Sequence, residues 1–132
     1  MRLTFPALVT LLAILVYIVT AINVGRAREK YKIAAPAITG NVDFERIFRI
    51  QMNTLEQLAA FLPALWLSSI YLSPLWSSAF GLIWIVGRIL YAIGYAKTAE
   101  RRDVGFVTAF IAFAALWAGA AFGVVRALLQ GM

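Results

Sequence analysis

The chain contains neither cysteine nor histidine in its 132 residues. The absence of cysteine excludes a disulfide framework, a thiolate nucleophile and a cysteine-based metal site. The absence of histidine removes the commonest general base and metal ligand, and we expect no metal centre. Any chemistry must therefore come from arginine, lysine, tyrosine, serine, carboxylates or a bound cofactor.

Charge is also scarce, since 14% of the residues are charged and 63% are hydrophobic, with a mean hydropathy of +0.85. A soluble domain of this size exposes far more polar surface, so the composition indicates an integral membrane protein. The net charge of +6 comes from clusters at 26–32, 46–49 and 97–102, between apolar stretches. That placement is typical of membrane topology and anionic headgroups, and we expect membrane lipids rather than nucleic acid as partners.

The apolar stretches predict a single all-α domain over residues 1–132, a membrane bundle of four helices. The expected helices cover about 3–24, 44–72, 75–96 and 105–129.

The first apolar stretch is long enough to cross a hydrocarbon core of about 30 Å. No small-residue cleavage site precedes Arg26, so we expect a retained helix rather than a signal peptide. The clean apolar part of the second, 58–72, is too short to cross alone and must carry part of 44–57 with it. The short turn at Ser73 and Pro74 predicts that the second and third helices are antiparallel neighbours.

Lysine and arginine set the expected orientation. They are concentrated in the first connection, from Arg26 to Val42, and in the third, from Lys97 to Gly105, whereas the turn between the second and third helices has none. The positive-inside rule places the two basic connections in the cytoplasm and both termini outside.

The second predicted helix begins with an unusual polar stretch, FERIFRIQMNTLEQ. Arg49, Asn53 and Glu56 are spaced i, i+4 and i+7 and share one stripe, which Glu45 and Arg46 extend by a turn. Such a stripe does not face lipid comfortably and should face a protein interior or a wet cavity. A structural salt-bridge ladder, with Glu45 pairing Arg49, and a functional site both remain open from this pattern.

The third predicted helix carries Arg88, Tyr91 and Tyr95 on one face, and Arg102 continues that face if the helix extends into the next connection. Arg88 lies about half-way along the helix and needs an acidic partner, for which Glu56 has the matching depth. The two stripes together predict a pocket near the cytoplasmic surface that suits a small zwitterionic or polyanionic ligand.

Two motifs extend this interpretation to a family. FERIFRIQMNTLEQ, followed by GRILYAIGYAKTAERR, resembles the MAPEG family, the membrane-associated proteins in eicosanoid and glutathione metabolism. The resemblance implies a homotrimer of four-helix subunits that binds glutathione as cosubstrate between neighbouring subunits. The positions that resemble glutathione-binding residues are Arg49, Asn53, Glu56, Tyr91 and Tyr95. We also assign Arg88 to this glutathione pocket. Arg28 and Gln51 match positions that the adjacent subunit contributes to the glutathione site.

The resemblance further assigns Arg102 to the arginine that stabilises the glutathione thiolate, although the adjacent Arg101 leaves the register open. A guanidinium near the sulfur favours the charged form of a thiol. Gln57 stands where the leukotriene synthase branch has tyrosine, which favours the microsomal and bacterial glutathione transferase branch. The expected second substrate is a lipophilic electrophile or a lipid hydroperoxide.

Three functions are compatible with these sequence features. The leading hypothesis is a glutathione transferase with a possible peroxidase activity, and the alternative is a non-catalytic lipid-binding scaffold like the lipoxygenase-activating branch. A small transporter fits less well, because the chain has no internal repeat or broken helix. The expected location is a bacterial inner membrane, since no C-terminal retrieval signal is present, with the endoplasmic reticulum as the alternative.

Overall fold

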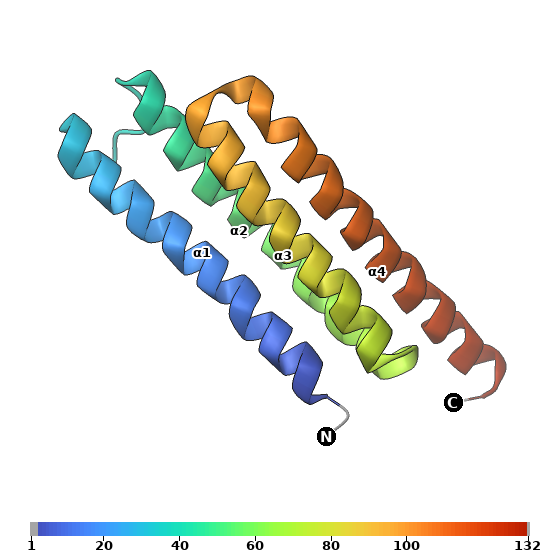
Figure 1. Cartoon of the computed structure of the whole chain (residues 1–132). Helices are drawn as coiled ribbons and strands as arrows, with labels where there is room; N and C mark the ends of the chain where they lie inside the picture. Colours follow the sequence, from blue (N-terminus) through green and yellow to red (C-terminus); the bar gives the residue numbers. More distant parts are fainter. Residues whose placement is uncertain (1–2, 132) are drawn as a thin grey trace.

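The computed structural model describes residues 3–131, which fold into four α-helices and one 3-10 turn. They are α1 (Thr4–Tyr31), α2 (Val42–Tyr71), α3 (Pro74–Lys97), η1 (Ala99–Arg102) and α4 (Asp103–Leu129). The helices run side by side in alternating directions, and both termini lie at the same end of the bundle (Figure 1). The predicted all-α membrane bundle is confirmed.

The central pair of helices is α2 and α3, each of which contacts both α1 and α4. Phe61 and Trp84 stack between them with ring centroids 3.9 Å apart, and both side chains are fully buried. Leu65, Leu116 and Val9 complete this core from α2, α4 and α1. The core is therefore built from all four helices, and it fixes the relative register of α2 and α3.

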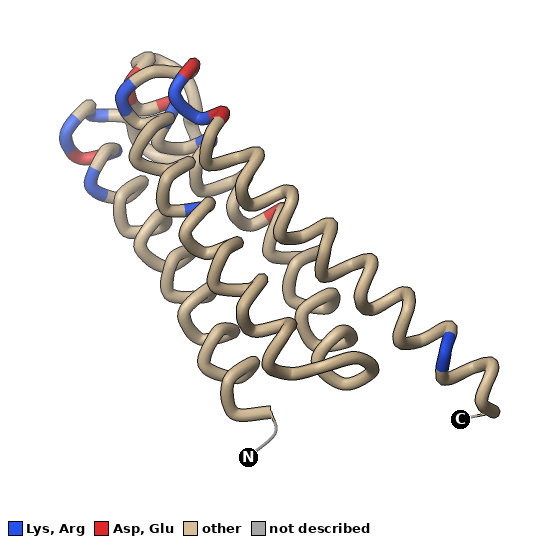
Figure 2. The backbone as a smooth tube through the Cα atoms, turned by 45° about the vertical axis from the view of Figure 1, so that its right-hand side comes forward, with Lys and Arg blue, Asp and Glu red and all other residues tan. Residues whose placement is uncertain are grey.

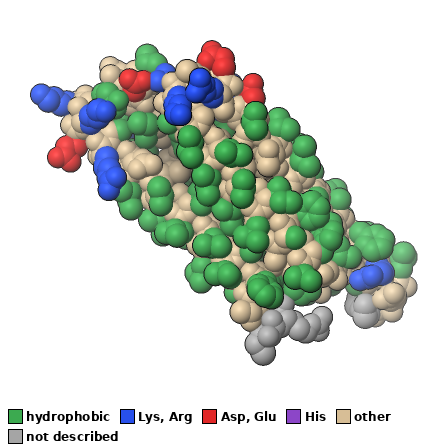
Figure 3. All heavy atoms as spheres, viewed as in Figure 1, with side chains coloured by type: hydrophobic (Ala, Val, Ile, Leu, Met, Phe, Trp, Pro, Cys, Tyr) green, Lys and Arg blue, Asp and Glu red, His purple; other side chains and the backbone are tan. Residues whose placement is uncertain are grey.

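Large apolar side chains also cover the outside of the bundle along its length (Figure 3). In the part of the chain described, three segments are long and apolar enough to cross a membrane: α1, α3 and Ala99–Leu129. The helix α2 is not among these segments. Its 30 residues give a length of about 45 Å, but its first half carries the polar stripe and is not apolar enough. The charged residues gather where η1 and the α1–α2 connection lie, which we term the basic end (Figure 2).

The end of α1 differs from the sequence prediction. The helix continues through residues 25–31 to Tyr31, where a loop was expected from Arg26 onward. The segment GRAREKY is rich in helix formers and has no proline before Pro36, so the backbone stays helical after the apolar run ends. Lys32, with a left-handed φ of 56°, terminates it. The basic residues that follow the apolar run therefore project from a helix.

Side-chain caps mark the starts of α2 and α3. The Asn41 Oδ1 accepts a hydrogen bond from the Phe44 N–H at 3.0 Å, and the Ser73 Oγ accepts one from the Trp76 N–H at 3.2 Å. Pro74 occupies the first turn of α3, where its missing N–H does not matter. The Ser73 cap lies in the very short turn between α2 and α3, which are antiparallel neighbours, as the sequence predicts.

Close backbone contacts hold α4 and η1 against α3. A Cβ atom at Gly94 would lie 2.2 Å from the Arg101 carbonyl oxygen, and one at Gly105 would lie 2.1 Å from the Tyr91 nitrogen. Both positions therefore require glycine, because the facing atoms belong to the backbone and cannot rotate away. The contact at Gly94 lets η1 fold back onto the end of α3.

We expect Gly94→Ala to lower the free energy of unfolding by about 1–3 kcal/mol, because the added methyl group overpacks this contact. Gly25→Ala is the matched control: it is also a helical glycine, a Cβ there meets nothing within 4 Å, and alanine adds up to about 1 kcal/mol of helix propensity. Thermal unfolding of both variants in the same detergent measures the difference. Equal melting temperatures for the two would contradict the close contact of η1 with α3.

Candidate functional site

Arg88 is the most deeply buried ionisable group of the site, with 1% of its surface exposed. Its Nη2 donates a hydrogen bond to the Thr54 Oγ1 at 2.9 Å, and its guanidinium carbon lies 4.2 Å from the centroid of the Tyr91 ring. Its Nε is buried without a hydrogen-bond partner among the described residues. A buried guanidinium needs such contacts, and they in turn fix the position of Tyr91.

The face of α3 continues from Tyr91 toward the basic end. Tyr91 and Tyr95 meet edge to face with ring centroids 5.5 Å apart, and the Arg102 guanidinium carbon lies 5.3 Å from the centroid of the Tyr95 ring. The Arg102 Nη1 also donates a hydrogen bond to the Ala99 carbonyl at 2.8 Å. Arg88, Tyr91, Tyr95 and Arg102 thus form a continuous ladder, which we term the α3 ladder.

Arg102 reaches this ladder by a route that the sequence did not predict. The α3 helix ends at Lys97, so the extended helix that would have placed Arg102 on the same face is wrong. Instead, η1 turns the chain back over Gly94 and delivers the guanidinium to Tyr95. The adjacent Arg101 contributes its backbone to that turn, and its side chain is exposed.

The polar stripe of α2 supplies a second wall. Asn53 is half-buried, and its Oδ1 lacks a hydrogen-bond partner in the described part of the chain. Arg49 and Glu56 are exposed. The stripe is therefore open toward the outside of the single chain and holds unpaired polar groups.

Two predicted pairings are wrong. Glu56 makes no ion pair with Arg88, and Glu45 makes none with Arg49: within residues 3–131 the one ion pair joins Arg46 to Asp43. The Glu45 carboxylate instead accepts a hydrogen bond from the Gly40 N–H at 3.1 Å. The polar stripe is consequently not a salt-bridge ladder, and its central charges remain available.

Thr54 is the residue that sequence reasoning missed. It lies on the buried face of α2, in the same row as Ile50, Leu58 and Phe61, and this spacing distinguishes it from the Glu56 stripe. The available signal was a hydroxyl between the apolar residues Ile50 and Leu58 of this row. Thr54 accepts a hydrogen bond from Arg88 without bringing a second charge into the bundle, whereas the Glu56 side chain is exposed.

Arg28 and Gln51 lie apart from the α3 ladder. The Arg28 Nη1 donates to the Ala37 carbonyl at 2.7 Å, and its guanidinium lies 5.1 Å from the centroid of the Phe44 ring. The Gln51 Nε2 donates to the Tyr17 Oη at 3.4 Å. Within one chain, both residues therefore make contacts between α1, α2 and the connection that joins them.

An apolar groove lies near the polar stripe. It runs between α2 and α4, has a volume of about 530 Å³, and begins at Ala59 and Ala60, one helical turn beyond Glu56. Pro63, Phe113 and Trp117 line its further length. The arrangement can thus present a polar anion-binding surface beside a path for an apolar molecule. Over residues 3–131 the structure brings no three carboxylate, histidine or cysteine side chains together as a metal site.

Known proteins resemble this chain over nearly its whole length. The model of the MAPEG family matches residues 6–122, which include the polar stripe and the α3 ladder. An uncharacterized protein of Synechocystis is 52% identical over 129 residues, covering 98% of this chain and 94% of the relative. Human microsomal glutathione S-transferase 2 is 38% identical over 110 residues, 83% of this chain and 75% of the relative. Leukotriene C4 synthase of Rattus norvegicus is 33% identical over 125 residues, 95% of this chain and 83% of the relative.

Proposed function

Because the chain belongs to the MAPEG family, we propose that it is a membrane-bound glutathione transferase, which activates glutathione as a thiolate and conjugates it to lipophilic electrophiles. The names of its human and rat relatives support this activity. The observation that carries the proposal is the position of Arg102, whose guanidinium is held over Tyr95 at the end of the α3 ladder.

Glutathione has two carboxylates, one ammonium group and a thiol, and the site offers a complement to each. Arg49 is exposed and free to bind a carboxylate, while Glu56 is free to bind the ammonium group. The unpartnered Asn53 side chain and the Tyr91 and Tyr95 hydroxyls supply further hydrogen bonds. Arg88, which is buried, acts by holding Tyr91 in place rather than by touching the ligand.

Arg102 is the catalytic residue of this proposal. A cysteine thiol has a pKa of about 8.5, and lowering it by about two units requires roughly 2.7 kcal/mol of preferential interaction with the thiolate. A guanidinium restrained by Ala99 and Tyr95 supplies such an interaction at a fixed point. The thiol proton passes to solvent as the thiolate forms. The thiolate then attacks the electrophilic carbon, so that a carbon–sulfur bond forms while the bond from that carbon to its leaving group breaks, and the departing anion takes up a proton from solvent.

The lipophilic substrate enters along the groove between α2 and α4, which starts one turn from Glu56. Apolar walls and a volume of about 530 Å³ suit an electrophile dissolved in the bilayer. A lipid hydroperoxide could use the same site: the thiolate would take the distal oxygen, and a second glutathione would complete reduction to the alcohol, water and glutathione disulfide.

We propose that a homotrimer completes the site, since Arg28 and Gln51 lie on the α1–α2 side and would reach the ligand of a neighbouring copy. Both side chains make their contacts away from the α3 ladder of their own chain. The basic end is proposed to face the cytoplasm, with both termini on the other side, in a bacterial inner membrane or, alternatively, the endoplasmic reticulum.

Glu56→Gln is expected to weaken glutathione binding about 10- to 100-fold, because a neutral amide loses the charge-assisted hydrogen bond to the ammonium group. The melting temperature should not change, since Glu56 is exposed and unpaired with Arg88. Calorimetric titration with glutathione measures the affinity, and Glu100→Gln, an exposed carboxylate on η1, is the matched control. Unchanged affinity in Glu56→Gln would remove this carboxylate from the proposed site.

A further inference from the structure

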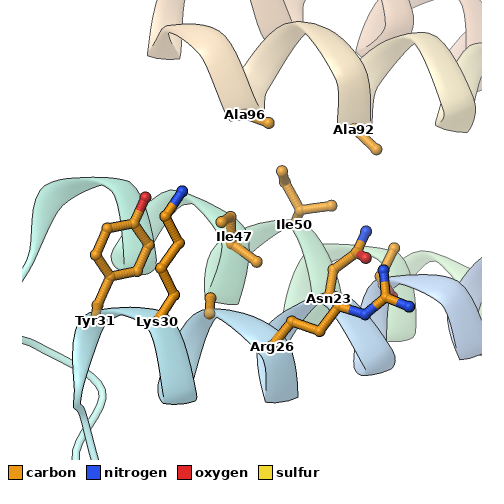
Figure 4. A pocket seen from close by; sticks show the side chains of 10 residues that line it. Asn23, Arg26, Lys30, Tyr31, Ile47, Ile50, Ala92 and Ala96 are labelled. Carbon is orange, nitrogen blue, oxygen red and sulfur yellow. The ribbon is translucent and has the colours of Figure 1, made fainter.

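A second hollow lies near the basic end, on the side of the bundle where α1 and α3 meet (Figure 4). Its volume is about 270 Å³. Asn23, Arg26, Lys30 and Tyr31 project into it from α1, while α2 and α3 close it with small or aliphatic side chains such as Ile50 and Ala92 (Figure 4). None of its lining residues belongs to the α3 ladder or to the polar stripe.

This hollow continues into an apolar groove between α1 and α3. The groove has a volume of about 480 Å³ and shares four lining residues with the hollow: Thr20, Asn23, Ala92 and Ala96. Its remaining walls are wholly aliphatic, formed by Leu15, Val16, Val19, Ile89 and Ile93. A single molecule can therefore occupy both spaces, with its apolar part in the groove.

The charged side chains that line the combined space are all positive. Arg26 and Lys30 stand at the hollow, one helical turn apart on α1, and no carboxylate is among the residues that line either space. The two cations lie just beyond the apolar part of α1, at the depth where lipid headgroups meet water. The Asn23 amide lies between the cations and the aliphatic walls, where it can donate a hydrogen bond to an ester or glycerol oxygen.

We propose that this space binds an anionic phospholipid, with the phosphate at Arg26 and Lys30 and an acyl chain along the groove between α1 and α3. A basic hollow between membrane helices complements such a headgroup, and the aliphatic groove complements the chain. A water-soluble anion would use the cations and leave the groove empty, which is why the continuity of the two spaces favours a lipid. The site is separate from the proposed glutathione site and does not depend on it.

Binding is measured by native mass spectrometry on delipidated protein, with phosphatidylglycerol and phosphatidylcholine of identical acyl chains. Phosphatidylglycerol should bind the wild type at least tenfold more tightly, and R26Q/K30Q should lose about 30-fold, as expected for two headgroup contacts. The control is R101Q/K97Q, which removes one arginine and one lysine, both exposed, from the same end without touching the hollow. Equal loss in the two double variants would assign binding to surface charge and overturn the proposal.

The groove is tested separately with Ala92→Phe, because Ala92 lines both spaces and a larger ring there obstructs the chain while leaving both cations. Val86→Phe, on the exposed surface of α3 and outside the groove, is its control. Phosphatidylglycerol binding should fall at least fivefold in Ala92→Phe and stay unchanged in Val86→Phe. Full binding in Ala92→Phe, or binding of glycerol phosphate as tight as that of phosphatidylglycerol, would mean that no lipid chain occupies the groove and would overturn the proposal.

Discussion

Replacing Arg102 with alanine is expected to lower turnover with glutathione about 10²- to 10³-fold, the effect of removing one preorganised charge-stabilising donor. The guanidinium is restrained by the Ala99 carbonyl and the Tyr95 ring, so it meets the developing thiolate without reorganising. The side chain is exposed and contributes nothing to the core, so the variant should keep the fold and its melting temperature. Steady-state conjugation of glutathione to a lipophilic electrophile measures the change.

Arg101→Ala is the control, and it resolves the register of the arginine pair. Arg101 packs its backbone against Gly94 and exposes its side chain, whereas Arg102 reaches the α3 ladder. Turnover should therefore remain within about twofold of wild type in Arg101→Ala, as is usual for an exposed side chain away from the site. Large loss in Arg101→Ala with full activity in Arg102→Ala would exchange the roles of the two residues.

Replacing Arg88 with alanine is expected to lower the free energy of unfolding by about 2–5 kcal/mol, because the truncation leaves a cavity between α2 and α3. Thr54→Val should cost about 1–3 kcal/mol by a different route, since it removes the acceptor of the Arg88 Nη2 hydrogen bond and leaves the charged donor buried. Thermal unfolding in detergent reports both effects, and circular dichroism checks that helix content is retained.

Arg88→Met separates the structural and functional contributions of this residue. A buried ion replaced by an apolar side chain of similar length often leaves stability nearly unchanged, so the melting temperature should stay close to that of the wild type. Tyr91, however, loses the guanidinium that lies 4.2 Å from its ring centroid, and glutathione affinity should fall. A stable Arg88→Met variant with wild-type affinity would show that Arg88 does not position Tyr91.

The sequence predicted the parts of this site that depend on helical periodicity. Arg49, Asn53 and Glu56 share a stripe because residues spaced by three and four share a face of any helix, and the same rule put Tyr91 and Tyr95 together. The number and approximate position of the helices followed in the same way from the apolar runs. These features are local, so the order of residues suffices to define them.

The features that sequence reasoning missed depend on contacts between segments. Arg88 selects Thr54 rather than Glu56 because the rotation of α2 about its axis is set by packing, including the stacking of Phe61 on Trp84. Arg102 arrives through a turn that exists only because Gly94 admits the Arg101 carbonyl. The end of α1 was misplaced because hydropathy marks the end of an apolar run, whereas helix propensity decides where the backbone leaves the helix.

The ultraviolet difference spectrum of the purified protein with glutathione near neutral pH measures whether Arg102 activates glutathione as a thiolate. A thiolate absorption band is expected in the wild type and should be lost in Arg102→Ala, while Arg101→Ala keeps it. Glutathione that binds to the wild type without any thiolate band would contradict this account and would favour a lipid-binding scaffold over a transferase.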